Sequence, residues 1–190
     1  AANFGSFMHQ GQICMSVEKV LVQESVFDEF LKGFVARASK LKVGDPTKDK
    51  ANIIGPLIND KQANKSREQI ADAIAKGAEV VLGGNVTDRF VEPTILLGVT
   101  PDMKIYREEN FGPVIPVIPF KTDEEAVAIA NDTEYGLSSG VITRDEYRGL
   151  RIARQLETGM CHINCSSVND EPHAPFGGAK ASGVGRLFLG

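Results

Sequence analysis

A cysteine near the start of the chain lies where a nucleophile could act. Cys14 follows Gly11, a residue type typical of the position just after a helix, and precedes a β-branched run that begins at Val17. A turn between two rigid elements exposes backbone N–H groups, which can stabilise an oxyanion. A thiolate in such a turn is a good nucleophile towards a carbonyl carbon, and His9 could activate it. A small structural cysteine would give the same local pattern.

The other cysteines do not have the spacing of a metal site. Cys161, His162, Cys165 and His173 lie close together, but the cysteines are spaced C-x3-C, whereas a zinc knuckle has C-x2-C. On a strand, Cys161 and Cys165 share one face and His162 points to the other. We therefore expect no metal site and interpret both cysteines as small apolar residues of a strand.

The glycines do not form a nucleotide-binding motif. The sequence contains neither G-x-G-x-x-G nor G-x-x-x-x-G-K-[ST], and Gly183-Val184-Gly185 is followed by Arg186, which breaks the dinucleotide pattern. A self-sufficient nucleotide-binding domain is therefore not indicated.

Composition narrows the class of protein. The 190 residues carry 21 Lys and Arg against 25 Asp and Glu, for a net charge of −4, so neither nucleic acid nor an anionic membrane is an expected partner. No apolar run approaches the ~20 residues of a membrane span. The three cysteines, an odd number, fit a reducing cytoplasm better than a disulfide framework.

Short β-branched runs alternate with stretches of helical periodicity. This alternation predicts one α/β domain, with a mostly parallel sheet covered by helices. One helix is expected to begin after Ser25, which is its expected N-cap. Further helices are expected over 60–76, 122–131 and 145–156, and Gly77 is expected to end the helix over 60–76. The expected strands are 17–22, 80–82, 91–97, 114–120, 140–143 and 160–164.

Six short segments, in order along the chain, resemble motifs of the NAD(P)-dependent aldehyde dehydrogenase family, and the resemblance covers the chain from end to end. They are Gly11-Gln12-Ile13-Cys14, Gly44-Asp45-Pro46, Ile54-Gly55-Pro56-Leu57, Glu109-Asn110-Phe111-Gly112-Pro113, Tyr135-Gly136-Leu137, and Pro175 to Lys180 with Ser182 to Arg186. The resemblance implies the aldehyde dehydrogenase catalytic-domain fold.

The resemblance also implies a role for individual residues. Cys14 would attack an aldehyde to form a thiohemiacetal, which loses hydride to NAD or NADP and leaves a thioester for water to cleave. Glu109 would hold the hydroxyls of the nicotinamide-side ribose, and Phe111 would pack against the nicotinamide end. Gln62 and Lys65 match positions that can touch the cofactor's ribose.

The segment from Asn164 to Phe176 corresponds to the loop that walls the substrate tunnel in this family. Its candidate substrate-binding residues are Ser166, Val168, Asn169 and Phe176. Two segments, Cys161-His162-Ile163-Asn164 and Phe4 to Gln12, resemble the benzaldehyde, salicylaldehyde and vanillin dehydrogenase branch of the family. An aromatic aldehyde is therefore the expected substrate. A semialdehyde site would need a cation for the distal carboxylate, and 164–175 contains no Lys or Arg. The ending Leu187 to Gly190 departs from the family pattern, which is richer in glycine.

We expect residues 1–190 to be a catalytic domain from which the family's N-terminal dinucleotide-binding domain and C-terminal oligomerisation strand are absent. The full-length enzyme is expected to be a cytoplasmic homo-oligomer, a dimer or a tetramer. The isolated chain is expected to bind dinucleotide weakly and to turn over little or no aldehyde. Two alternatives stay open. One is the same fold acting on an aliphatic aldehyde or semialdehyde, and the other is a truncated, non-catalytic binding or structural domain.

Overall fold

The computed structural model describes residues 1–185, so Arg186 and the unusual 187–190 ending lie outside the described part. Contacts divide the chain into two compact units, of which the first covers 2–119 and the second begins at Phe120. Within 1–185, no helix combines the length and the apolar character that crossing a membrane requires.

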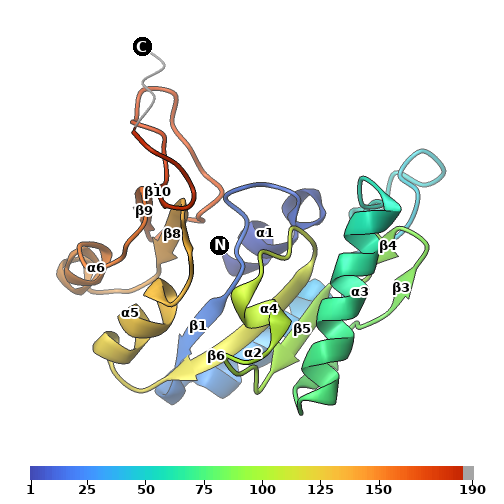
Figure 1. Cartoon of the computed structure of the whole chain (residues 1–190), viewed down its shortest axis with the longest axis horizontal. Helices are drawn as coiled ribbons and strands as arrows, with labels where there is room; N and C mark the ends of the chain where they lie inside the picture. Colours follow the sequence, from blue (N-terminus) through green and yellow to red (C-terminus); the bar gives the residue numbers. More distant parts are fainter. Residues whose placement is uncertain (186–190) are drawn as a thin grey trace. The chain divides into compact units, whose positions relative to one another are not determined.

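The first unit is built on a four-stranded mixed sheet with the order β1-β6-β5-β2 (Figure 1). Its strands are β1 (Val20–Gln23), β2 (Glu79–Leu82), β5 (Thr94–Leu97) and β6 (Val114–Phe120). β5 and β6 are parallel, whereas β2 pairs antiparallel with β5 at the edge. The expected α/β class is confirmed, and the sheet is mixed because β2 runs against its neighbour.

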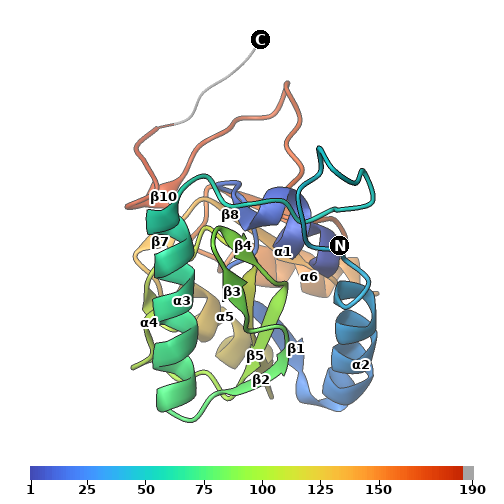
Figure 2. The same cartoon turned by 90° about the vertical axis from the view of Figure 1, so that its right-hand side faces the viewer.

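Helices cover both faces of this sheet. α2 (Phe27–Ala38) and α3 (Asp60–Ala75) lie on opposite sides of it (Figure 2). The core is closed by α1 (Ala2–Phe7), where the Phe7 ring stacks on Phe34 with centroids 5.8 Å apart. The shorter elements are η1 (Met8–Gly11), η2 (Glu24–Val26), β3 (Val86–Thr87), β4 (Phe90–Val91) and α4 (Lys104–Arg107).

Several element boundaries differ from the sequence prediction: β1 begins at Val20, where the prediction begins at 17, and the strand expected over 140–143 covers Ser138–Val141. Two further differences have a clear local cause. α2 begins at Phe27, with Val26 as its N-cap and no side-chain cap bond, because the chain first makes the turn η2, which contains Ser25. The N-cap prediction for Ser25 is therefore wrong. The strand expected over 91–97 is divided into β4 and β5 by Pro93, which has no N–H to donate to a ladder. The expected end of α3 is confirmed, since Gly77 follows it with φ +97°. Asn59, which the sequence analysis did not single out, caps the start of α3.

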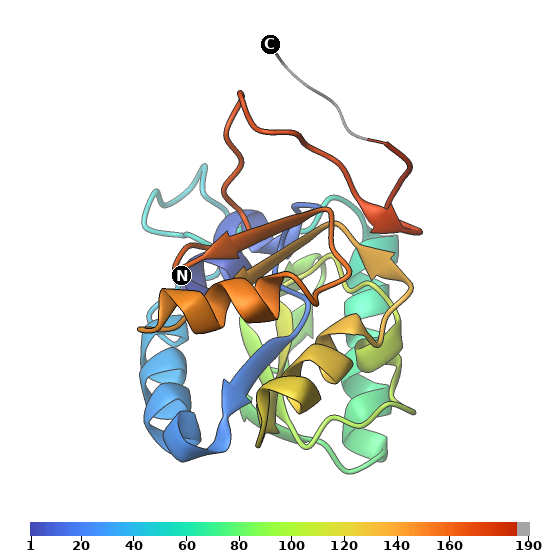
Figure 3. The same ribbon diagram turned by 90° about the vertical axis from the view of Figure 1, so that its left-hand side faces the viewer.

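The second unit contains a small parallel pair, β8 (Ser138–Val141) and β9 (Met160–Ile163), connected through α6 (Glu146–Ala153). α6 packs along this pair (Figure 3), where Gly149 allows a close approach: a Cβ built on it would lie 3.2 Å from the Ile163 side chain. The unit also holds α5 (Asp123–Asn131) and an antiparallel pair, β7 (Tyr135–Gly136) with β10 (Ala179–Lys180).

Candidate active site

Cys14 lies in a tight turn between η1 and β1, and its side chain is exposed. The Ser16 N–H donates to the Ile13 carbonyl oxygen at 2.8 Å and closes this turn around the cysteine. Before it, His9, Gln10 and Gly11 have φ values of 53°, 59° and 72°, in the left-handed region. A run of left-handed residues that includes two non-glycines is uncommon and persists only where surrounding contacts hold it.

Side-chain amides hold the left-handed run in place. The Gln12 side-chain oxygen accepts from the Ile58 N–H at 2.9 Å. The Gln10 amide is oriented with its oxygen 2.9 Å from the Gly55 N–H and its nitrogen 3.0 Å from the His9 carbonyl oxygen. The predicted motif around Gly55 therefore supports the loop that carries Cys14. His9 is exposed and, within 1–185, makes no hydrogen bond to Cys14, so the two do not form a catalytic dyad in this structure.

A second loop, residues 109–112, packs directly against the cysteine loop. A Cβ built on Gly11 would lie 2.3 Å from the Gly112 carbonyl oxygen, so these two backbones touch in a way that only glycine permits at position 11. Two motifs separated by about a hundred residues of sequence are thereby brought together. This loop carries Glu109 and Phe111, the main candidates for cofactor binding.

The backbone of the 109–112 loop is held by side chains on both sides. Glu18 accepts from the Asn110 N–H at 2.8 Å and from the Phe111 N–H at 3.3 Å. On the carbonyl side, Gln62 Nε2 donates to the oxygens of Asn110 and Phe111 at 2.5 and 3.1 Å. The buried Asn110 side chain donates to the Gly112 carbonyl oxygen at 2.9 Å. These contacts support the left-handed Phe111, whose φ is 53°.

Glu18 is a site residue that the sequence analysis missed. Desolvation, the largest effect, raises the pKa of Glu18 from 4.5 to about 7, although the N–H groups of Asn110 and Phe111 oppose the rise. Glu109 raises this pKa further and Lys65 lowers it, so both predicted cofactor residues lie within electrostatic range. Perturbed carboxyl groups gather at functional sites, and this pKa arises from burial in the folded chain, so no signal in the sequence marks Glu18.

The four predicted cofactor-binding residues lie on or beside this loop. Glu109 is half-buried and, in the part of the chain that the structure describes, accepts no hydrogen bond, which leaves its carboxylate oxygens available. Lys65 lies on α3 in the same neighbourhood. Gln62 uses its amide nitrogen on the loop carbonyls, so the structure shows it as a support of the loop. The cofactor contacts of these residues and Phe111 stay predictions.

The late glycine-rich motif has a clear structural role in the second unit. Gly136 pairs with Ala179, and its N–H donates to the Ser182 hydroxyl at 2.9 Å. A Cβ built on Gly159 would lie 1.7 Å from the Gly177 carbonyl oxygen, so the chain packs there backbone against backbone. Lys180 donates to the carbonyl oxygens of Asn131, the last residue of α5, and of Thr133, just beyond it, at 2.7 and 3.1 Å.

The substrate-binding candidates also belong to the second unit. They lie in a stretch without regular secondary structure, between β9 and β10. The Val168 N–H donates to the Ser166 hydroxyl at 3.3 Å, Asn169 Nδ2 lies 3.2 Å from Cys165 Sγ, and Phe176 is half-buried. The structure does not test their roles, which stay predictions.

The remaining thiols differ from Cys14. Cys161 is half-buried, and desolvation raises its pKa, partly offset by a hydrogen bond with Ser139. Cys165 is half-buried beside Asn169. Within residues 1–185, no group of three or more His, Cys, Asp or Glu side chains has the arrangement of a metal site.

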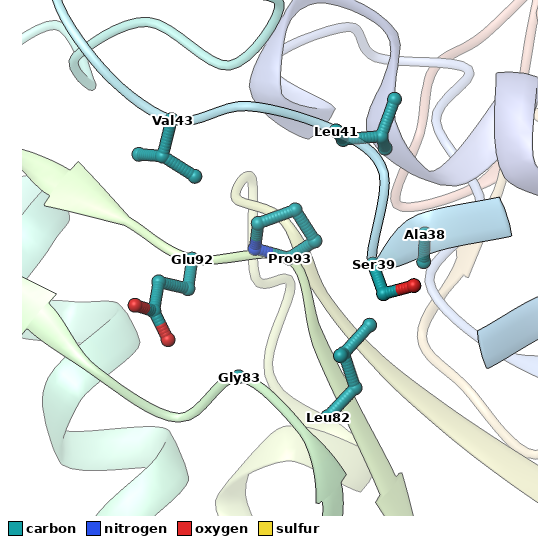
Figure 4. A pocket seen from close by; sticks show the side chains of 8 residues that line it. All are labelled: Ala38, Ser39, Leu41, Val43, Leu82, Gly83, Glu92 and Pro93. Carbon is teal, nitrogen blue, oxygen red and sulfur yellow. The ribbon is translucent and has the colours of Figure 1, made fainter. Parts of the chain in front are cut away.

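A small, open pocket lies away from these loops in the first unit (Figure 4). It is lined by Ala38, Ser39, Leu41, Val43, Leu82, Gly83, Glu92 and Pro93. None of these is a candidate site residue, and the Glu92 carboxylate already accepts from Asn85 at 3.0 Å. The pocket therefore has no part in the candidate site.

Comparison with known proteins gives the family. The profile described as "Aldehyde dehydrogenase family" matches residues 1–189. Benzaldehyde dehydrogenase YfmT of Bacillus subtilis is 49% identical over 98% of this chain, which spans 38% of that relative's length.

Solved structures of aldehyde dehydrogenases have the same fold as this chain. A salicylaldehyde dehydrogenase from Pseudomonas putida G7, complexed with salicylaldehyde, superposes with a TM-score of 0.95 at 48% identity, over 98% of this chain and 39% of that one. Glyceraldehyde-3-phosphate dehydrogenase GapN from Methanocaldococcus jannaschii, complexed with NADP, gives a TM-score of 0.92 at 41% identity, over 98% and 40%. With its predicted motifs assembled into this fold, the chain belongs to the aldehyde dehydrogenase family.

Proposed function

We propose that this chain is the catalytic-cysteine part of an NAD(P)-dependent aldehyde dehydrogenase that oxidises an aromatic aldehyde to a carboxylic acid. One observation supports this most strongly: the Cys14 loop packs on the 109–112 loop through Gly11 and Gly112. The proposed nucleophile and the proposed cofactor-binding residues therefore belong to two backbones in direct contact.

Cys14 performs the covalent chemistry in this proposal. Its thiolate sulfur bonds to the aldehyde carbon, and the carbonyl oxygen becomes an oxyanion that N–H groups of the 13–16 turn can stabilise. Loss of hydride from this thiohemiacetal leaves a thioester on the sulfur. Water then attacks the thioester carbon and the C–S bond breaks, so that the carboxylate leaves, the thiolate is regenerated and the two protons of the water pass to solvent.

A nicotinamide dinucleotide, when bound, supplies the hydride acceptor. The residues present fit such a group because Glu109 offers a half-buried carboxylate with unused acceptor oxygens, which suits the two neighbouring hydroxyls of a ribose. Phe111 offers an aromatic ring on the same loop. Both NAD and NADP are compatible with these groups. The two cofactors differ at the 2′-position of the adenosine ribose, whereas Glu109 and Phe111 are proposed to contact the nicotinamide end.

An aromatic aldehyde is the proposed substrate class. The named relatives act on benzaldehyde and salicylaldehyde, as their names state. The segment 164–175 contains no Lys or Arg to pair with a charged substrate, which favours a neutral ring. The similarity to glyceraldehyde-3-phosphate dehydrogenase favours an aliphatic aldehyde as the second candidate.

The chain spans 38% of the length of its benzaldehyde dehydrogenase relative, so the proposed activity needs more polypeptide than these 190 residues. We propose that polypeptide outside these 190 residues supplies the dinucleotide-binding domain and the C-terminal oligomerisation strand, and that the complete enzyme is a homo-oligomer. A cytoplasmic location is proposed from the three free cysteines.

Acylation by p-nitrophenyl benzoate tests the proposed chemistry without a cofactor. Thiolate attack on this ester releases p-nitrophenolate and leaves the same class of thioester, so a stoichiometric burst of absorbance is expected, with a benzoyl group on Cys14 by mass spectrometry. Cys14→Ala should abolish the burst, whereas the matched control Cys165→Ala should retain it. Acylation that is equal at all three cysteines would support the structural, non-catalytic alternative.

A further inference from the structure

Two consecutive backbone N–H groups converge on a single carboxylate. The oxygens of Glu18 lie 2.8 Å from the Asn110 nitrogen and 3.3 Å from the Phe111 nitrogen. Successive N–H groups that point into one concavity form a characteristic anion-binding arrangement, and an ionised acceptor makes such bonds shorter and stronger. Glu18 lies just before β1, so it connects the 109–112 loop to a strand of the sheet.

The other polar groups of this loop are already engaged. Gln62 donates to the carbonyl oxygens of Asn110 and Phe111, and the Asn110 side chain donates to the carbonyl oxygens of Gly112 and Val114. Glu18 is the side chain that satisfies the two N–H groups. Without it, both N–H groups lose their acceptor.

We propose that Glu18 is the positioning residue of the 109–112 loop. Its carboxylate holds the Asn110 and Phe111 amides so that Glu109 and the Phe111 ring face the dinucleotide. This inference rests on the proposed function, since the cofactor roles of Glu109 and Phe111 are part of that proposal.

The same carboxyl group makes the loop sensitive to pH. Desolvation raises the pKa of Glu18 to about 7; Glu109 raises it further, and Lys65 on α3 lowers it. Once protonated, the carboxyl keeps one strong acceptor oxygen for two N–H groups. The support of the loop therefore strengthens as pH rises through neutrality.

Proton–nitrogen correlation spectra of the full chain between pH 5 and 9 test this proposal. The Asn110 and Phe111 amide protons should move downfield together as pH rises, with one shared midpoint near 7. Amide shifts that stay flat over this range would overturn the proposal. This arm needs no variant, so it stays informative even if a substitution prevents folding.

Three variants assign the titration. Glu18→Gln should abolish it and change the Phe111 coupling constant that reports its φ, while Glu109→Gln should leave a shared titration with a lower midpoint. Glu29→Gln, an exposed residue of α2 with the same change in charge, should change nothing. A titration that persists in Glu18→Gln would overturn the proposal. Because these readouts involve neither ester nor cofactor, they can fail or succeed independently of the acylation test.

Discussion

Gly11 and Gly112 are in backbone contact: a Cβ built on Gly11 would lie 2.3 Å from the Gly112 carbonyl oxygen and 2.7 Å from its carbonyl carbon. The contact joins the loop that carries Cys14 to the loop that carries Glu109 and Phe111. Gly11 also has φ +72°, so both its conformation and its surroundings exclude a side chain.

Gly11→Ala should therefore lower the free energy of unfolding by about 2–4 kcal/mol, because left-handed strain and overpacking add. Urea denaturation measures this change. The control is Gly33→Ala in α2, where a Cβ meets nothing within 4 Å and alanine should stabilise the helix by about 0.5–1 kcal/mol. Equal effects of the two substitutions would contradict the contact.

Glu18 should make the chain less stable as pH rises, although its bonds to the two N–H groups strengthen, because the desolvation cost of charging this carboxyl exceeds what those bonds return. Its folded pKa of about 7 exceeds the unfolded value of 4.5, so between these pH values the folded state holds a proton that the unfolded state has released. This contribution is fully present below about pH 4.5 and is lost as pH rises to about 7, a fall of about 3 kcal/mol.

Urea denaturation at several pH values, with Glu18→Gln beside Glu29→Gln, measures this slope. As pH rises, the free energy of unfolding of the wild-type chain should fall relative to that of Glu18→Gln. The free energy of unfolding of Glu29→Gln should change with pH as that of the wild-type chain does. A wild-type chain that gains stability relative to Glu18→Gln over this range would contradict the sign.

In the second unit, Asp123 and Arg148 form an ion pair that connects α5 to α6. Arg148 Nε and Nη2 both donate to the carboxylate, at 2.9 and 2.5 Å, and lower the pKa of Asp123. Asp123→Asn should cost about 0.5–1 kcal/mol at pH 7, because the pair is partly exposed. A depressed folded pKa stabilises above the unfolded value of 3.8 and ceases to do so as pH falls through the folded one, so this cost should disappear in acid.

Glu124→Gln is the matched control, since Glu124 lies in the same first turn of α5 and also interacts favourably with the helix dipole. Thermal unfolding should show a larger loss for Asp123→Asn than for Glu124→Gln at pH 7, and this difference should be smaller at pH 3. The same loss at both pH values would mean that the pair with Arg148 contributes nothing.

The three thiols should react with iodoacetamide at different rates. Cys14 is exposed and should be alkylated first, whereas Cys161 should be slowest, because burial raises its pKa and lowers its thiolate fraction at neutral pH. Peptide mapping after short exposure at pH 7 gives the order. Alkylation of Cys161 as fast as that of Cys14 would contradict the exposure and the pKa direction.

Local signals in the sequence predicted most elements well. Gly77 after α3 acts through its own backbone freedom within one turn of the helix, so the sequence carries the whole signal. Ser25 failed as an N-cap because the chain leaves β1 through a short turn before α2 begins. That turn depends on how β1 meets α2, which residue spacing does not reveal.

The sequence also predicted some of the candidate site residues. Cys14 could be singled out from its place between a glycine and a strand, and the short motifs predicted its partners Glu109 and Phe111. The family comparison confirms the class of protein that these motifs predicted. The parallel pairing of β8 with β9 follows from the helix expected between them, whereas the reversed edge strand β2 has no signature in its own residues.

Only the tertiary structure identified Glu18. It lies 92 residues from Asn110 in sequence, and by itself it resembles any acidic residue before a strand. Its pKa and its hold on the loop come from burial and from two N–H groups supplied by a distant segment, and neither exists until the chain has folded. The sequence by itself determined which residues could do chemistry, because residue type and local turns are encoded nearby. Which side chain holds them in position was decided by long-range packing, since only packing brings a carboxylate and a remote backbone into the same desolvated space.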